Sequence, residues 1–214
     1  FRLGEYDFSH LELKAFADNP YNVDLRALSH EDMAYHMSKR AAEIACDARE
    51  EYTRDPQYDG RPLFVLGSIG PSNRVLSCTD ANLKLSTFDE MMDNFHVQVL
   101  GLIDGGADVL LYETQQDILE VKAAVLGGQR AMRERGKKLP IMVQVTVDRF
   151  SKMQIFNTDI HAALVTVAGI GIDTFGINCS IGPDLMARTV EKLARYSPLP
   201  ISVVPNAGLP VSEA

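Results

Sequence analysis

The stretch FGINCSIGP, residues 175–183, shows how this chain folds, because it joins an apolar strand to a helix through a Gly-Pro turn. In a strand–turn–helix unit, the residues just after the strand lie in the loop layer where α/β folds bind their ligands. Cys179 lies at this point. From its position alone it could be a nucleophile, a metal ligand or an inert, small apolar residue.

The same unit recurs along the chain. Short apolar runs alternate with segments of helical period, and Ser29 followed by Asp32 is the first helix N-cap signal. The pattern predicts strands at residues 62–67, 107–112, 140–146, 173–178 and 200–204, and helices at about 30–52, 86–104, 116–135, 159–168 and 183–196. Five such alternations predict an α/β fold with a parallel sheet over residues 29–214, preceded by an irregular segment or insertion at 1–28.

Two arrangements of the sheet remain open at this point. No G-x-G-x-x-G motif follows the first strand, so a doubly wound dinucleotide-binding fold has no direct support. Polar or turn-forming residues follow every predicted strand, as a (β/α)₈ barrel with its site on one rim requires. Five strands cannot close such a barrel, so either the sheet is open or the chain is a fragment. The lack of a starting Met favours a fragment.

Composition excludes several classes of protein. The 214 residues are 46% hydrophobic, but no apolar run is long enough to span a membrane and no secretory leader opens the chain. A net charge of -8, with no basic stripe, argues against nucleic acid as a partner. Cysteines at 46, 78 and 179 are too widely spaced for a disulfide framework, which indicates free thiols in a reducing cytoplasm.

Four residues at predicted strand ends are candidates for function, each with a simpler alternative. Glu113 could bind an ammonium group or act as a base, or it could cap the next helix. Asn178 could satisfy backbone groups at a strand end, and Asn206 could serve only to form a turn. No histidine lies at a strand end and no C-x-x-C or H-x-x-x-H spacing occurs, so spacing leaves Cys179 undecided.

Four motifs occur in order along the chain: VLGSIGPSNR at 65–74, GGADVLLYET at 105–114, the Asn178-Cys179 pair, and PNAGLP at 205–210. Together they resemble the homocysteine-binding barrel of the homocysteine S-methyltransferase family. The PNAGLP motif is most similar to the branch of cobalamin-dependent methionine synthases. The resemblance implies a TIM (β/α)₈ barrel, of which this chain supplies about five consecutive units, the third to the seventh strand.

The resemblance also implies a role for each candidate. In the family a zinc ion is held by three cysteines, and Cys179 matches the first of them; the other two, an adjacent pair, have no counterpart before the chain ends. Glu113 matches the residue that contacts the homocysteine amino group, and Asn178 matches a neighbouring pocket residue. Asn206 matches an asparagine that occupies the zinc before the substrate binds.

The implied activity is zinc-dependent methyl transfer to homocysteine, giving methionine. Zinc deprotonates a bound thiol, which can then attack a methyl group. The resemblance implies methylcobalamin on another module as the donor, and folate- and cobalamin-binding modules as partners. Two alternatives stay open: a cobalamin-independent enzyme with a betaine or S-methylmethionine type of donor, and a non-catalytic fragment with an incomplete zinc site.

Overall fold

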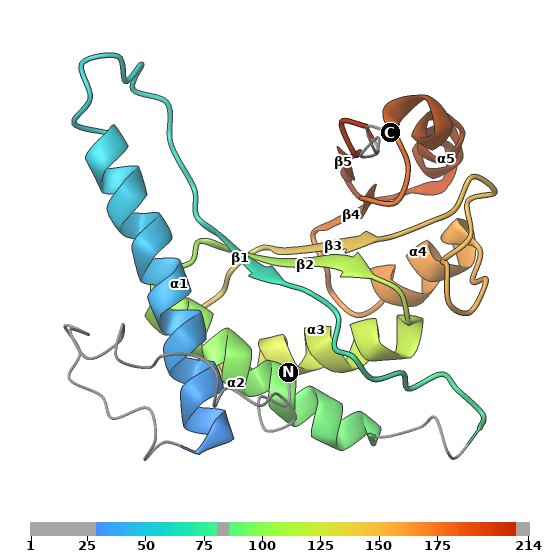
Figure 1. Cartoon of the computed structure of the whole chain (residues 1–214), viewed down its shortest axis with the longest axis horizontal. Coiled ribbons are helices and arrows are strands. Elements are labelled where there is room, and N and C mark those ends of the chain that lie inside the picture. Colours follow the sequence, from blue (N-terminus) through green and yellow to red (C-terminus); the bar gives the residue numbers. More distant parts are fainter. Residues whose placement is uncertain (1–28, 81–85, 209–214) are drawn as a thin grey trace, which may run out of the picture.

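A computed structural model describes residues 29–80 and 86–208 of the chain. The predicted irregular segment, residues 1–28, lies outside the described residues. Helices and strands alternate along the chain (Figure 1). Their order is α1 (His30–Tyr52), β1 (Leu66–Ile69), α2 (Phe88–Asp104), β2 (Val109–Gln115), α3 (Ile118–Glu134), β3 (Ile141–Val145), α4 (Ile160–Ala168), β4 (Thr174–Asn178), α5 (Pro183–Tyr196) and β5 (Ile201–Val204).

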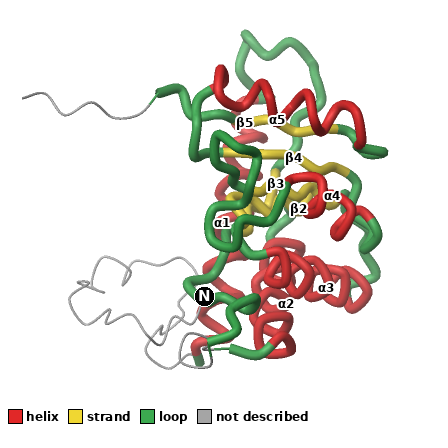
Figure 2. Tube along the Cα trace, turned by 90° about the vertical axis from the view of Figure 1, so that its right-hand side faces the viewer, coloured by secondary structure: helices red, strands yellow, loops and turns green. Residues whose placement is uncertain are grey.

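The five strands form one parallel sheet in the order β1-β2-β3-β4-β5. Figure 2 shows β2 to β5 one above the other in the order of the sequence. A doubly wound sheet reverses its order at a switch point, and this sheet does not. Because crossovers between parallel strands are right-handed, an order without reversal puts the connecting helices on one side of the sheet. This is the winding of a barrel, and the predicted partial (β/α)₈ fold is confirmed.

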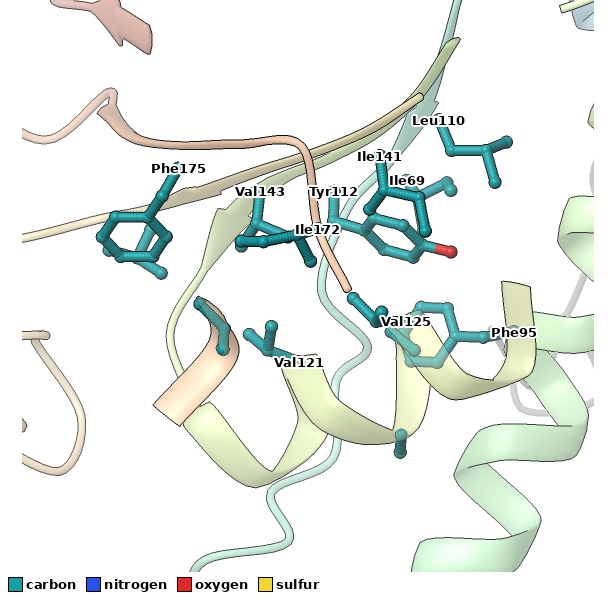
Figure 3. Close-up of a cluster of buried hydrophobic side chains, with 14 of the residues drawn as sticks. Ile69, Phe95, Leu110, Tyr112, Val121, Val125, Ile141, Val143, Ile172 and Phe175 are labelled. Carbon is teal, nitrogen blue, oxygen red and sulfur yellow. The ribbon is translucent and has the colours of Figure 1, made fainter. Parts of the chain in front are cut away.

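The core lies between the sheet and these helices. Alternate strand residues, among them Leu110, Tyr112, Val143 and Phe175, are fully buried. In Figure 3, Tyr112 and Val143 point toward the helix that carries Val121 and Val125, which is α3. Since side chains alternate across a strand, the residues between them face the opposite, concave side of the sheet. Among the described residues, no helix is both long and apolar enough to cross a membrane.

Most predicted bounds agree with the structure, and the first strand is the exception. The bounds of α1 and α5 are as predicted, and the Ser29 side chain accepts the Asp32 N–H at 3.1 Å, which confirms the cap. The strand predicted at 62–67 is wrong in its start, since β1 begins at Leu66. Phe64 in that apolar run is 65% exposed, so its hydrophobicity does not mark a buried strand. The second strand is longer than predicted at its carboxyl end. It extends to Gln115, so Glu113 and Thr114 belong to β2.

Glycines let the first two helices touch. A Cβ atom added at Gly101 of α2 would lie 2.3 Å from the Tyr35 carbonyl oxygen of α1, and one added at Gly105 would lie 2.3 Å from the Lys39 oxygen. No side chain fits at such distances, so the backbones of α1 and α2 are in contact at both positions. This contact fixes the position of α1 against α2.

We predict that Gly101→Ala destabilises the protein. The methyl group forces α1 away from α2, and overpacking of this kind costs about 1–3 kcal/mol, more than the roughly 1 kcal/mol that alanine gains over glycine in a helix. Urea denaturation would measure the free energy of unfolding. Gly169→Ala is the control, because a Cβ there meets nothing within 4 Å and the backbone φ is -75°. Equal stability of the two variants would contradict the contact.

Candidate functional site

The carboxyl ends of β2 and β4 are in contact, although β3 lies between these two strands in the sheet. The Thr114 N–H donates to Asn178 Oδ1 at 2.8 Å, and Asn178 Nδ2 donates to Thr114 Oγ1 at 2.9 Å. The pairing of β2 with β3 passes from Tyr112 opposite Val143 to Gln115 opposite Val145, so β2 contains one extra residue. Such a bulge bends its strand and re-aims the side chains there. The bulge therefore lets residues of two strands that are not neighbours in the sheet bind each other.

Cys179 joins this pair. Asn178 Nδ2 lies 3.3 Å from its Sγ, and Thr114 Oγ1 lies 3.9 Å from it. The Cys179 N–H donates to the Val204 carbonyl oxygen at 3.0 Å, which ties the loop to β5. Strict alternation would put Asn178 and Cys179 on opposite faces, but β4 ends at Asn178 and Cys179 has a φ of +57°. The left-handed backbone brings the thiol back to the side of the amide.

Backbone strain is concentrated at this point. Five non-glycine residues of the described chain have a positive φ, and three of them are Thr114, Cys179 and Ser180. A left-handed conformation costs roughly 1–3 kcal/mol for such residues and persists only where the surroundings enforce it. For a β-branched residue such as Thr114 it is a true outlier. Strain of this kind is typical of functional sites.

Glu113 lies on the concave side of β2, next to Thr114, and is half-buried. Its carboxylate accepts a hydrogen bond from Ser68 Oγ of β1. The N-cap of α3 is Asp117, whose side chain accepts the Leu119 N–H at 2.9 Å, so the alternative that Glu113 caps this helix is wrong. Ser68 was missed by the sequence reasoning, since nothing in its local sequence points to a partner 45 residues away.

Asn206 follows β5 and its backbone joins the Cys179 loop. The Asn206 N–H donates to the Ile181 carbonyl oxygen at 3.2 Å, and the Asn206 side chain is half-buried. The structure thus puts all four candidates at the carboxyl ends of strands. Asn178 and Cys179 are in contact, Asn206 is bonded through its backbone to Ile181 of the same loop, and Glu113 is bonded to Ser68 of β1.

The described residues do not contain a complete metal site. Cys179 is a free, half-buried thiol, and sulfur is a preferred zinc ligand. Within residues 29–80 and 86–208, no three His, Cys, Asp or Glu side chains lie close enough together to bind one metal ion. The Cys179 thiol fits one sulfur ligand of a zinc site, and the other described residues do not complete that site.

The loop after β1, which lies on the same rim, is held by two buried acids of α3. Asp117 accepts the N–H groups of Leu76 at 2.6 Å and Ser77 at 2.8 Å. Glu120 accepts the Ser72 N–H at 2.6 Å and is 2% exposed. Burial raises the pKa of Glu120 to about 7; the nearby Asp117 raises it as well, while the hydrogen bonds from Ser72 lower it.

The fold and the cluster at the strand ends define a member of the (β/α)₈ barrel class with its site on the carboxyl rim of the sheet. A family model described as homocysteine S-methyltransferase matches residues 12–214. The chain therefore belongs to the homocysteine S-methyltransferase family, which confirms the resemblance seen in its motifs.

Relatives of known name support this assignment. The chain is 37% identical over 199 residues to the methionine synthase of Mycobacterium leprae, and 36% identical over 203 residues to that of Mycobacterium tuberculosis. These matches cover 92% and 94% of this chain but only 16% of each relative. The chain thus spans about one sixth of the length of the methionine synthases that it matches.

Solved structures show the same fold. The homocysteine methyltransferase MmuM from Escherichia coli, in its apo form, matches with a TM-score of 0.67 at 25% identity, over 86% of this chain and 63% of that chain. Its metallated form matches with the same TM-score at 24% identity, over 86% and 62%.

We predict that Glu120 makes stability depend on pH. The folded protein holds the Glu120 proton more tightly than the unfolded chain, whose glutamate has a pKa of 4.5, so stability falls as the pH rises from about 4.5 to 7. Glu120→Gln stays neutral and can still accept the Ser72 N–H. Between pH 5 and pH 8, urea denaturation should show the variant gaining about 2 kcal/mol relative to the unsubstituted protein.

The control for this measurement is Glu31→Gln, which changes an exposed glutamate in the first turn of α1. Its stability should follow that of the unsubstituted protein at both pH values. If the stability of Glu120→Gln also follows that of the unsubstituted protein at both pH values, the Glu120 carboxyl does not retain its proton as described.

Proposed function

We propose that this chain is the homocysteine-binding part of a cobalamin-dependent methionine synthase, and that it serves zinc-dependent methyl transfer to the homocysteine thiol. The observation that carries the proposal is the strained contact of Cys179 with Asn178 and Thr114 at the carboxyl rim of the sheet. Membership of the homocysteine S-methyltransferase family supplies the reaction class. The cytoplasmic location stays a prediction.

Cys179 is proposed as one zinc ligand, and Asn206 as a ligand that gives way to the substrate. A bound Zn²⁺ would lower the pKa of a coordinated thiol far enough for homocysteine to react as a thiolate near pH 7. The chain's own contribution is to present the Cys179 sulfur, half-buried, where the loops after β4 and β5 are joined by backbone hydrogen bonds. The described residues contain no group of three His, Cys, Asp or Glu, so further ligands are proposed to come from beyond them.

Glu113 is proposed to bind the ammonium group of homocysteine. Its carboxylate is half-buried on the concave side of the sheet, where attraction to a cation is stronger than in open water. The hydrogen bond from Ser68 occupies one carboxylate oxygen and limits its rotation. The second oxygen can accept an N–H of the substrate, so the acid would hold the amino group while the thiol lies toward Cys179.

The length of the relatives supports methylcobalamin on another module as the methyl donor, with folate- and cobalamin-binding modules as partners. A chain that matches 16% of a methionine synthase leaves most of that protein for other modules. A cobalamin-independent donor is not favoured, because the chain is 36–37% identical to methionine synthases over 92–94% of its length. A non-catalytic role is not favoured either, because the chain belongs to the homocysteine S-methyltransferase family and matches methionine synthases over 92–94% of its length.

We predict that Cys179→Ser in the intact protein removes zinc and abolishes methyl transfer. A serine hydroxyl is a much poorer ligand than a thiolate, so affinity for Zn²⁺ should fall at least about 100-fold, beyond the loss typical for a hydrogen-bond partner of a ligand. Metal analysis and competition with a chelator would measure it. Cys46→Ser is the matched control, since Cys46 lies on α1 against Gly105 and Gly106, far along the chain from the strand ends. Unchanged zinc in Cys179→Ser would refute the proposal.

We also predict that Glu113→Gln weakens the use of homocysteine by removing a charge-assisted hydrogen bond. A loss of roughly 10- to 100-fold in kcat/KM corresponds to the usual strength of such a bond. The same measurement with 4-mercaptobutyrate, which lacks the amino group, is the control. The substitution should barely change kcat/KM for that analogue; an equal loss for both thiols would mean that Glu113 does not bind the ammonium group.

A further inference from the structure

We propose that Thr114 and Asn178 are positioning residues, which hold the Cys179 sulfur in the orientation that metal binding requires. The inference rests on the function proposed above and deepens it. It gives Thr114 a role, and it assigns Asn178 to the support of Cys179 in place of contact with the substrate.

The side-chain amide of Asn178 forms its hydrogen bonds within the protein. A side-chain amide has two N–H donors and one carbonyl acceptor. Its Oδ1 accepts the Thr114 N–H at 2.8 Å, and its Nδ2 lies 2.9 Å from Thr114 Oγ1 and 3.3 Å from Cys179 Sγ. Both N–H groups thus have partners within the protein. Asn178 is also 1% exposed, so its amide offers a substrate almost no surface.

The hydroxyl of Thr114 lies between the Asn178 amide and the Cys179 sulfur. Because Thr114 Oγ1 accepts a hydrogen bond from Asn178, its own hydrogen is available to donate, and Cys179 Sγ lies 3.9 Å away. The sulfur therefore has an amide donor beside it and a hydroxyl that is able to donate to it. Partners of this kind orient the ligands of metal sites.

The Asn178 amide also connects two residues with strained backbones. Thr114 and Cys179 both have left-handed backbones, with φ of 60° and 57°. Asn178 is bonded to the backbone N–H of Thr114 and to the side chains of both residues, so one buried amide connects the two strained positions. A rigid support fits a ligand that must keep its direction when the metal exchanges other ligands.

The test is Thr114→Val in the intact protein, which removes the hydroxyl and keeps the branched shape. Affinity for Zn²⁺, measured by competition with a chelator, should fall about 10-fold. With Co²⁺ in place of zinc, the sulfur-to-metal absorption band should shift. Thr114→Ser, which restores the hydroxyl, should restore both. Thr114→Ala should show the same loss of zinc affinity and the same spectral shift as Thr114→Val. It replaces Thr114→Val in the test if that variant does not fold.

Three outcomes separate the possibilities. Wild-type zinc affinity and an unchanged Co²⁺ spectrum in both Thr114→Val and Thr114→Ala would overturn the positioning role, even if Cys179→Ser loses zinc as the proposed function requires. A rise in KM for homocysteine with zinc affinity unchanged would also overturn it, because the cluster would then serve the substrate. If Cys179→Ser keeps its zinc, the proposed function and the positioning role fall together.

Discussion

One side of every central strand must be covered by helices, and the rest of the structure depends on this constraint. Leu110, Tyr112 and Val143 are fully buried between the sheet and α3 (Figure 3). With this side occupied, polar groups are left to the concave side and to the strand ends. The hydrogen bond between Gln144 and Ser202 at 2.6 Å, and that between Ser68 and Glu113, lie on this opposite side. The packing of the core thus decides where chemistry can occur.

Apolar side chains are also exposed on the two outer strands of the sheet. Leu66 of β1 is 44% exposed, and Val204 of β5 is 54% exposed. In a closed barrel each outer strand would pair with a further strand and such side chains would be covered. The winding of the sheet and these exposed edges agree with the coverage of 63% of the MmuM chain. Strands beyond β1 and β5 would cover them.

The sequence predicts the elements well because helical period and N-cap residues are local signals. It predicts β1 poorly, because the apolar run around Phe64 resembles a buried strand while that side chain is exposed. It identifies Glu113, Asn178, Cys179 and Asn206 as residues at strand ends. It cannot show that Asn178 binds Thr114, since the two are 64 residues apart and only the bulge in β2 brings them together.

The left-handed turn at Cys179 is the clearest case of a feature that local sequence does not contain. Glycine and asparagine favour this conformation, and cysteine followed by serine does not. The turn is enforced from outside, by the bond of the Cys179 N–H to the Val204 carbonyl oxygen and by the Thr114 hydroxyl beside its sulfur. Alternation along β4 would have turned the thiol away from Asn178. Tertiary contacts from β2 and β5 therefore set the direction of the thiol on which the proposed chemistry depends.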